Sequence, residues 1–217
     1  MSARIVFDLD GTLIDSAPDI RGVANRLLRP HGAQITLAQT HSFIGNGVDV
    51  FVARMLDTLD LNSDLAKELV PEFKRAYLVA VHETVAYPHV FEALDRLLVE
   101  GHRLGLCTNK PLAPCMAVLD HLSLTGYFET VWGGDSLEVH KPDPAPLNAA
   151  FDALGDGPCL YVGDSEVDAE TAQSAAVPFL LFTEGYRKTD VADIPHTATF
   201  SEFDDLPALV TRYAGSR

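Results

Sequence analysis

Strand-like and helix-like segments alternate along most of this chain, and that alternation limits its possible folds more than any other feature. Five runs of apolar, β-forming residues occur, and segments with apolar residues at helical spacing separate the last four of them. The runs are RIVFDL from Arg4, RLGLCT from Arg103, ETVWGG from Glu129, CLYVGD from Cys159 and PFLLFT from Pro178. Strands joined through helices form a parallel sheet with helices on both faces, so the pattern predicts an α/β fold of three layers.

The connection between the first two runs is too long for a single crossover. About 94 residues lie between Asp8 and Arg103, whereas a strand, a crossover helix and the next strand take about 30 residues in all. The excess has helical periodicity, for example in PDIRGVANRLLRPHG, and a structureless loop of this length would be unusual. We therefore expect an α/β core formed by residues 1–15 and 83–217, with an all-helical insertion of residues 16–82 that acts as a lid.

Capping signals predict where two helices start. Ser16 and Asp19 have the spacing of a capping box, which indicates that the first helix of the insertion begins directly after the first strand's loop. Ser165 and Asp168 have the same spacing before EVDAETAQSAA. Asp168 therefore has a structural explanation beside any chemical role.

Four polar stretches follow predicted strands or open predicted helices. They are Asp8-Leu9-Asp10-Gly11-Thr12, Thr108-Asn109-Lys110, Lys141-Pro142, and Gly163-Asp164-Ser165 followed by Asp168. Asp8, Thr108 and Asp164 each fall at the carboxyl end of a strand, and parallel sheets bind their ligands at that edge. Each stretch alone has an ordinary explanation, such as a helix cap or a solvated loop. All four in this order indicate one shared site.

The residue types in these stretches suit a phosphate ester bound together with a divalent cation. Asp8 and Asp10 are one residue apart, and like charges that close require a cation, a shared proton or water. Mg²⁺ prefers carboxylate, carbonyl and water oxygens, which predicts a site formed by the carboxylates of Asp8 and Asp164 and the backbone carbonyl of Asp10. Thr108, at a helix N-terminus, and the cation of Lys141 would hold the anion.

Charge and composition exclude several classes of partner. The chain has 217 residues, with 16 Lys and Arg against 31 Asp and Glu, and a net charge of -15. Nucleic acids and anionic membranes bind clustered positive charge, so we expect neither as a partner. We also expect no signal peptide and no membrane span. The three cysteines are widely spaced, which predicts a reducing, cytoplasmic location. A monomer and a homodimer both stay open.

The four motifs together resemble those of the haloacid dehalogenase superfamily of phosphotransferases. The matching segments are DLDGT, TNK, KP and GDSEVD, and the helical insertion resembles that superfamily's type-1 cap. Within the superfamily, VFDLDGTLIDSAPDI, IGNGVD, HKPDPAPL and YVGDSEVDAETA look most like phosphoglycolate phosphatases. The resemblance implies a Rossmann-like three-layer core with an inserted cap. It also implies a Mg²⁺-dependent phosphatase of a small phosphomonoester, with 2-phosphoglycolate as the leading candidate.

The same resemblance implies a role for each motif residue. Asp8 is the nucleophile that forms an aspartyl-phosphate, and Asp10 is the general acid and base. Thr108 and Lys141 bind the phosphoryl oxygens as their charge redistributes. Asp168 lies behind the metal ligands and orients metal-bound water or Lys141.

Substrate binding is expected to involve the cap as well as the core. Gly45-Asn46-Gly47 is predicted to lie over the phosphate, where glycine allows close backbone approach and Asn46 donates to a small carboxylate. Asn109 is expected beside the same ligand. Arg54 is a second candidate for the carboxylate, although an arginine at such a position is more often a solvated helix residue. The segment EGYRKTD from Glu184 follows the fifth strand and carries no assigned role.

The same motif residues are also compatible with other functions. A sugar-phosphate phosphatase, or a mutase resembling β-phosphoglucomutase, would keep the fold and the nucleophile. A receiver-like signalling domain would also use a phosphorylated Asp with a Thr and a Lys. The inserted cap and Asp10 argue against this last alternative, because a signalling domain benefits from a long-lived aspartyl-phosphate.

Overall fold

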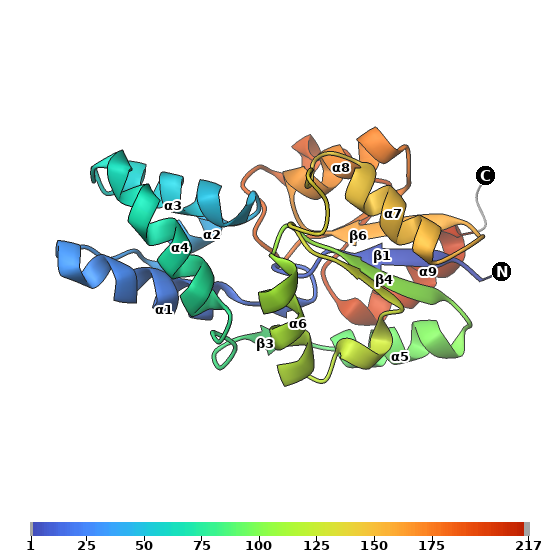
Figure 1. The fold of residues 1–217 in the computed structure, drawn as a ribbon. Helices are drawn as coiled ribbons and strands as arrows, with labels where there is room; N and C mark the ends of the chain where they lie inside the picture. The colour runs from blue at the N-terminus through green and yellow to red at the C-terminus, as the bar shows by residue number, and fades with distance from the viewer. Residues whose placement is uncertain (1, 215–217) are drawn as a thin grey trace.

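The protein consists of a six-stranded parallel sheet with helices on both faces and a separate group of four helices (Figure 1). The computed structural model describes residues 2–214. The strands are β1 (Arg4–Phe7), β2 (Ile14–Asp15), β3 (Val85–Ala86), β4 (Arg103–Cys107), β5 (Thr130–Trp132), β6 (Cys159–Gly163), β7 (Phe179–Phe182) and β8 (Ala198–Phe200). The α-helices are α1 (Ala17–Leu28), α2 (Leu37–Phe43), α3 (Gly47–Thr58), α4 (Ala66–Tyr77), α5 (Val90–Val99), α6 (Leu112–His121), α7 (Ala145–Ala153), α8 (Glu166–Ala175) and α9 (Leu206–Tyr213). Within residues 2–214, no helix has the length and apolar character needed to cross a membrane.

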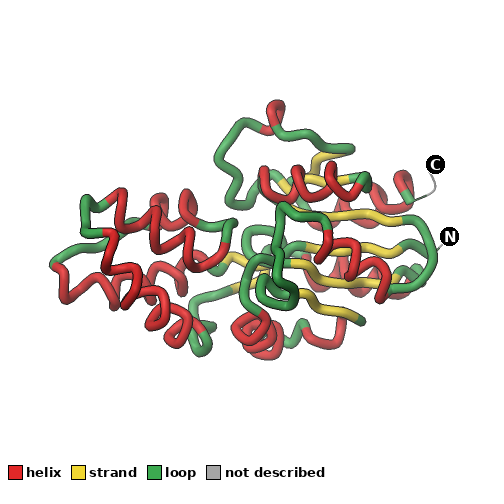
Figure 2. Tube along the Cα trace, turned by 45° about the horizontal axis from the view of Figure 1, so that its top comes forward, coloured by secondary structure: helices red, strands yellow, loops and turns green. Residues whose placement is uncertain are grey.

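Alternate residues of the central strand face opposite layers of helices. The strands of the sheet lie in the order β5-β4-β1-β6-β7-β8, and every neighbouring pair is parallel. Ile5 and Phe7 of β1 pack in one hydrophobic cluster with α5, α6 and α9, whereas Val6 packs in another with α7 and α8. Figure 2 shows helices on both sides of the strands. Successive side chains of a strand point to opposite sides, so both faces of the sheet are buried. The predicted α/β fold of three layers is confirmed.

Helices α1 to α4, which form the cap, have a hydrophobic core of their own. Its buried members are Ile20, Val23, Ala24, Leu28, Ile35, Phe43, Val48, Phe51, Val52, Met55, Leu56, Leu69, Phe73 and Tyr77. None of them belongs to the two clusters that pack on the sheet. Figure 1 shows the cap beyond one end of the strands, with both chain termini at the opposite end. The division into a core of residues 1–15 and 83–217 and a cap of residues 16–82 stays a prediction, which the separate clusters support.

The two chain segments that connect the cap to the core lie side by side and form a pair of short strands. β2 pairs with β3 in antiparallel fashion, and Asp15 lies opposite Val85. On the cap side of this ribbon, the buried carboxylate of Asp19 accepts hydrogen bonds from Glu83 N at 2.9 Å, Thr84 N at 2.7 Å and Thr84 Oγ1 at 2.7 Å. The segments that enter and leave the cap are therefore held together.

Two predictions of local structure are wrong. Helix α1 begins at Ala17, as predicted, but Ser16 and Asp19 do not form a capping box, because the Ser16 hydroxyl donates to Asp10 Oδ1 at 2.6 Å and Asp19 binds the segment that leaves the cap. The sheet also has one strand more than predicted, because β8 has only three residues and no long apolar run. The second capping signal is correct: Ser165 donates to Asp168 Oδ2 from its N–H at 3.1 Å and from its hydroxyl at 2.7 Å.

Candidate active site

Asp8, Thr108 and Asp164 lie close together because their strands are neighbours. Asp8 follows β1, Thr108 follows β4 and Asp164 follows β6, and β1 lies between the other two strands. All three residues line one cavity at the carboxyl end of the sheet. The cap contributes its own lining residues, among them Gly45, Gly47, Val48, Phe51, Phe73 and Tyr77. The cavity therefore lies between the sheet edge and the cap.

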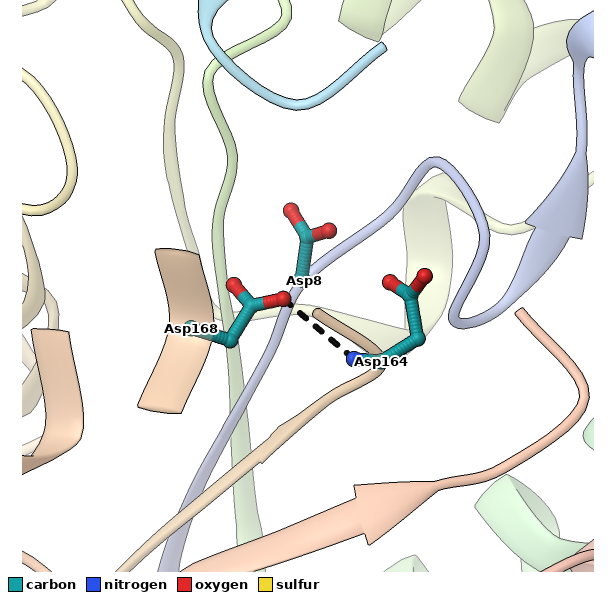
Figure 3. A group of neighbouring side chains, drawn as sticks. All are labelled: Asp8, Asp164 and Asp168. Carbon is teal, nitrogen blue, oxygen red and sulfur yellow. Dashed lines mark hydrogen bonds between the residues drawn. The ribbon is translucent and has the colours of Figure 1, made fainter. Parts of the chain in front are cut away.

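Three buried aspartates lie together at this cavity, and two of them, Asp8 and Asp164, line it (Figure 3). One carboxylate oxygen from each of Asp8, Asp164 and Asp168 lies within 4.8 Å of those of the other two. Figure 3 shows the side chains of Asp8 and Asp164 pointing to the same side. Burial raises the pKa of Asp8 to about 6, with Lys141 acting in the opposite direction. Burial and the charges of Asp168 and Asp8 also raise the pKa of Asp164.

A divalent cation fits this cluster through two of its three aspartates. Asp168 is the least available, because its Oδ1 accepts from Lys141 Nζ and Tyr161 OH, both at 2.7 Å, and its Oδ2 accepts from Ser165. The carboxylates of Asp8 and Asp164 are oxygen ligands of the kind that hard cations prefer. A cation there would also offset the repulsion and desolvation that raise both of their pKa values.

Lys141 joins Asp8 to Asp168. Its Nζ lies 2.8 Å from Asp8 Oδ1, 2.7 Å from Asp168 Oδ1 and 2.8 Å from Tyr161 OH, and its side chain is 3% exposed. Burial opposes a charge at Lys141, but the two carboxylates outweigh it and raise the lysine's pKa. Burial likewise opposes a charge at Asp168, and Lys141 outweighs it and lowers that pKa. Lys141 is therefore a buried positive charge beside Asp8, in contact with Asp168 and Tyr161. Its predicted role of binding phosphoryl oxygens, and the predicted orienting role of Asp168, stay predictions.

Asp10 is held by a different set of partners. Its Oδ1 accepts hydrogen bonds from Ser16 Oγ at 2.6 Å and from Lys110 Nζ at 3.0 Å. Lys110 also donates to the hydroxyl of Tyr77, at the end of cap helix α4, and its side chain is 2% exposed. Burial opposes a charge on Lys110, but Asp10 and Tyr77 together raise its pKa. Lys110, to which the sequence assigns no role, thus holds the Asp10 carboxylate and connects it to the cap. The predicted use of the Asp10 carbonyl as a metal ligand stays a prediction.

Thr108 and Asn109 form the turn between β4 and α6. Thr108 Oγ1 accepts from Lys110 N at 3.2 Å, and the residue lines the cavity. Asn109 Nδ2 donates to the carbonyl of Gly45 at 2.9 Å and to that of Lys141 at 2.8 Å. Its Oδ1 is buried and has no hydrogen-bond partner in the part of the chain that the structure describes. Asn109 therefore ties the cap loop to the core and presents an unused acceptor beside the cavity.

The cap loop of residues 45–47 lines the cavity with its glycines. Gly45 and Gly47 have φ values of 118° and 82°, in the left-handed region that favours glycine. Asn46 is not among the lining residues, and its Oδ1 accepts from Arg54 Nη2 at 2.9 Å. Arg54 also donates to the Phe43 carbonyl at 3.1 Å. The side chains of Asn46 and Arg54 therefore stabilise the loop, which differs from the expectation that Asn46 donates to the substrate.

Tyr186, in the segment after β7, holds Asp164 and the start of the cap. Its N–H donates to Asp164 Oδ2 at 2.6 Å, and its hydroxyl accepts from Ser16 N at 2.8 Å. Gly11 is needed opposite this contact, because a Cβ there would lie 2.6 Å from Asp164 Oδ2 and 2.7 Å from the Tyr186 ring. Sequence reasoning missed Tyr186 because a backbone N–H that orients a carboxylate leaves no pattern in residue types.

Comparisons with known proteins agree with this geometry. The family model of haloacid dehalogenase-like hydrolases matches residues 5–182. The phosphoglycolate phosphatase of Rhodobacter capsulatus is 43% identical over 219 residues and covers 100% of both chains. A phosphoglycolate phosphatase of Cereibacter sphaeroides is 46% identical over 212 residues, with 96% of this chain and 97% of the other covered.

A solved structure extends the likeness to three dimensions. A crystal structure described as a predicted phosphoglycolate phosphatase from Haemophilus somnus matches with a TM-score of 0.88 at 31% identity, covering 95% of this chain and 96% of that one. The likeness thus covers most of both chains, so it includes the sheet and the inserted cap. The chain belongs to the haloacid dehalogenase-like hydrolase family, and within it the protein is a phosphatase.

Proposed function

We propose that this phosphatase hydrolyses 2-phosphoglycolate to glycolate and inorganic phosphate, with Mg²⁺ held by Asp8 and Asp164. The observation that carries the chemistry is one cavity lined by two aspartates, each with its own buried lysine: Asp8 with Lys141, and Asp10 with Lys110. The choice of substrate is supported by the relatives named phosphoglycolate phosphatase.

Asp8 is the proposed nucleophile. A carboxylate oxygen attacks phosphorus in line, so that a bond forms between Asp8 and the phosphoryl group while the bond from phosphorus to the glycolate oxygen breaks. Asp8 is ionised at neutral pH, because its pKa, raised chiefly by burial, is about 6. A Mg²⁺ ion held by Asp8 and Asp164 would shield this carboxylate from the charge of the phosphate. Lys141 and Thr108 bind the phosphoryl oxygens as their charge redistributes.

Asp10 is the proposed general acid and base. It gives its proton to the departing glycolate oxygen in the first step. In the second step it takes a proton from the water that attacks phosphorus, the bond from phosphorus to Asp8 breaks, and inorganic phosphate leaves. The contacts from Ser16 Oγ at 2.6 Å and Lys110 Nζ at 3.0 Å hold the Asp10 carboxyl in a fixed position for both transfers.

Mg²⁺ should stabilise the protein more at pH 7.5 than at pH 5. Burial raises the pKa of Asp8 to about 6 and raises that of Asp164. Both carboxyl groups therefore bind a proton more tightly in the folded protein than in the unfolded chain. The stability that protonated Asp8 gives to the metal-free fold is lost as pH rises from about 4 to about 6, and the contribution of Asp164 is likewise lost as pH rises. At pH 7.5, a bound cation offsets the repulsion between the ionised carboxylates of Asp8 and Asp164 and so stabilises the fold. At pH 5, protons compete with the cation for these carboxylates. Thermal unfolding with Mg²⁺ and with a chelator at each pH measures the difference.

Asp164→Asn is the matched control for that measurement. It should lose most of the Mg²⁺-dependent rise in Tm, because one of two proposed carboxylate ligands is gone. Asp143→Asn changes a carboxylate whose Oδ1 accepts from Ala145 N at 2.8 Å, outside the acidic cluster, and should keep the full rise. An equal rise at both pH values in the unaltered protein would contradict the proposed site.

A panel of phosphomonoesters assayed with Mg²⁺ tests the substrate. We expect 2-phosphoglycolate to have the highest kcat/KM, by about tenfold or more over sugar phosphates, because a site with polar groups for a substrate's charged end discriminates against analogues that lack it. Released phosphate and glycolate should appear in equal amounts. An isomerised sugar phosphate would indicate a mutase, and a stable phosphorylated protein would indicate a receiver-like domain. If sugar phosphates have a higher kcat/KM than 2-phosphoglycolate, the proposed substrate is wrong, although the protein is still a phosphatase.

The setting of the enzyme is also a proposal. We infer a cytoplasmic protein that acts as a monomer or homodimer without a nucleic-acid partner. The net charge of -15 supports the last point, because nucleic acids repel an acidic protein. Sedimentation at several concentrations distinguishes monomer from homodimer, and cell fractionation tests the location.

A further inference from the structure

Lys188 differs from the other lysines that line the cavity. Lys110 and Lys141 are each paired with an aspartate, at 3.0 Å and 2.8 Å. Lys188 also lines the cavity, but its Nζ donates to the backbone carbonyl of Ile44 at 2.8 Å, and it has no ion-pair partner within residues 2–214. A neutral carbonyl accepts one of the three hydrogen bonds that the ammonium can donate, and it does not balance the ammonium's positive charge.

The backbone at Lys188 is fixed by an acidic residue at the start of α8. Glu166 Oε1 accepts from Lys188 N and Thr189 N, both at 2.6 Å, and from Thr189 Oγ1 at 2.9 Å. The segment after β7 is therefore anchored to the core at Glu166, and the side chains of Tyr186 and Lys188 reach from it to the cap. A Cβ built on Gly45 would lie 4.0 Å from Lys188 Nζ, so the amine reaches the glycine loop that lines the cavity.

The positive charge near Lys188 is not neutralised locally. Partial burial and the nearby charge of Arg54 lower the pKa of Lys188, and Glu166 and Asp164 only partly oppose this. Arg54 itself donates to Asn46 and to the Phe43 carbonyl. The cavity thus has an acidic, cation-binding part at Asp8 and Asp164 and a cationic part where Lys188 meets the cap loop. A ligand with a second anionic group would complement that cationic part.

We propose that Lys188 binds the carboxylate of the substrate while the phosphoryl group lies at Asp8 and Lys141, and so sets the preference for phosphorylated acids. This inference rests on the proposed function, because 2-phosphoglycolate has a carboxylate one methylene from its ester oxygen. The Nζ exchanges the Ile44 carbonyl for the carboxylate, or donates to both. Since the amine comes from the core and its present acceptor from the cap, the carboxylate lies at the junction of the two.

A different role for Lys188 would be a latch that holds the cap to the core through Ile44. The two roles differ in their dependence on substrate. A latch serves every phosphomonoester equally, because all of them need the cap in place. A carboxylate-binding residue serves only substrates that carry the carboxylate.

The test compares 2-phosphoglycolate with ethyl phosphate, in which a methyl group replaces the carboxylate. Lys188→Met should lower kcat/KM for 2-phosphoglycolate by about tenfold to a hundredfold, mainly through KM, as expected for the loss of a hydrogen bond between charged groups. It should leave ethyl phosphate unchanged within about twofold. Lys188→Arg should restore most of the activity on 2-phosphoglycolate, because it keeps the charge. Lys67→Met is the matched control, since it removes the same charge from an exposed cap lysine paired with Asp64.

The outcomes separate this inference from the proposed function. An equal fall for both substrates in Lys188→Met would establish the latch and overturn carboxylate binding. Unchanged kcat/KM for both substrates in that variant would overturn any role of Lys188 in binding and leave the substrate proposal intact. If the unaltered enzyme itself hydrolyses ethyl phosphate as well as 2-phosphoglycolate, the proposed substrate fails first, and the inference fails with it.

Discussion

Asp8→Asn is expected to abolish phosphatase activity, with kcat at least about 10,000-fold lower. An amide lacks the charge and the nucleophilicity to attack phosphorus, so no aspartyl-phosphate forms. The amide oxygen can still accept the hydrogen bond that Lys141 Nζ makes to Asp8 Oδ1 at 2.8 Å, so the fold should persist. Steady-state phosphate release measures the loss. Acid quenching of protein mixed with labelled substrate shows whether label becomes bound to the chain.

Asp95→Asn is the matched control for this variant. It makes the same change at an exposed position of α5, where the carboxylate accepts from Tyr127 OH at 2.9 Å, and it should keep full activity. The Tm of Asp8→Asn should stay close to that of the unaltered protein. Burial raises the pKa of Asp8, so the charged carboxylate that the substitution removes does not stabilise the fold. Activity above a hundredth of the original in Asp8→Asn would rule out Asp8 as the nucleophile.

Asp10→Asn is expected to lower kcat for 2-phosphoglycolate by about 1,000-fold, because its amide can neither give nor take the proton. The amide oxygen can still accept from Ser16 and Lys110, so the loss should be chemical rather than structural. A substrate with a good leaving group, such as 4-nitrophenyl phosphate, needs no proton in the first step. With it, the variant should release 4-nitrophenolate in a burst and accumulate phosphorylated Asp8, since the second step lacks its base.

The same variant should keep its affinity for Mg²⁺. Only the backbone carbonyl of Asp10 is a predicted ligand, and the substitution leaves it in place. The concentration of Mg²⁺ that gives half the rise in Tm measures this affinity, and Asp164→Asn provides the contrast of a lost carboxylate. Equal loss of Mg²⁺ affinity in Asp8→Asn and Asp10→Asn would contradict the separate roles. If Asp10→Asn lost as much first-step activity on 4-nitrophenyl phosphate as on 2-phosphoglycolate, that result would also contradict the separate roles.

The parts that sequence predicts well depend on the geometry of parallel sheets. Alternating strands and helices imply that Asp8, Thr108 and Asp164 meet at one edge, and these three residues do line one cavity. Lys141 is in a loop, so its position beside Asp8 could be inferred only from the motif order. That pairing, at 2.8 Å, agrees with the resemblance quoted for the sequence.

The parts that sequence misses are contacts between the cap and the core. Lys110 stands inside a recognised motif, yet nothing in its spacing indicates that Tyr77 of the cap and Asp10 of the core both meet its ammonium. A contact inside the cap was missed as well: Asn46 has the right chemistry for a substrate, but its Oδ1 accepts from Arg54 of α3 at 2.9 Å. Such pairings depend on how the cap sits over the sheet, which periodicity alone does not determine.

The paired strands β2 and β3 make the cap a replaceable unit of the chain. Asp15 and Val85 face each other in an antiparallel pair, and a turn of about two residues is enough to join such positions. One helical insertion can therefore be exchanged for another without rethreading the sheet. A transplanted cap would replace lining residues such as Phe51 and Phe73, while the phosphoryl-transfer residues and Lys188 would stay in the core.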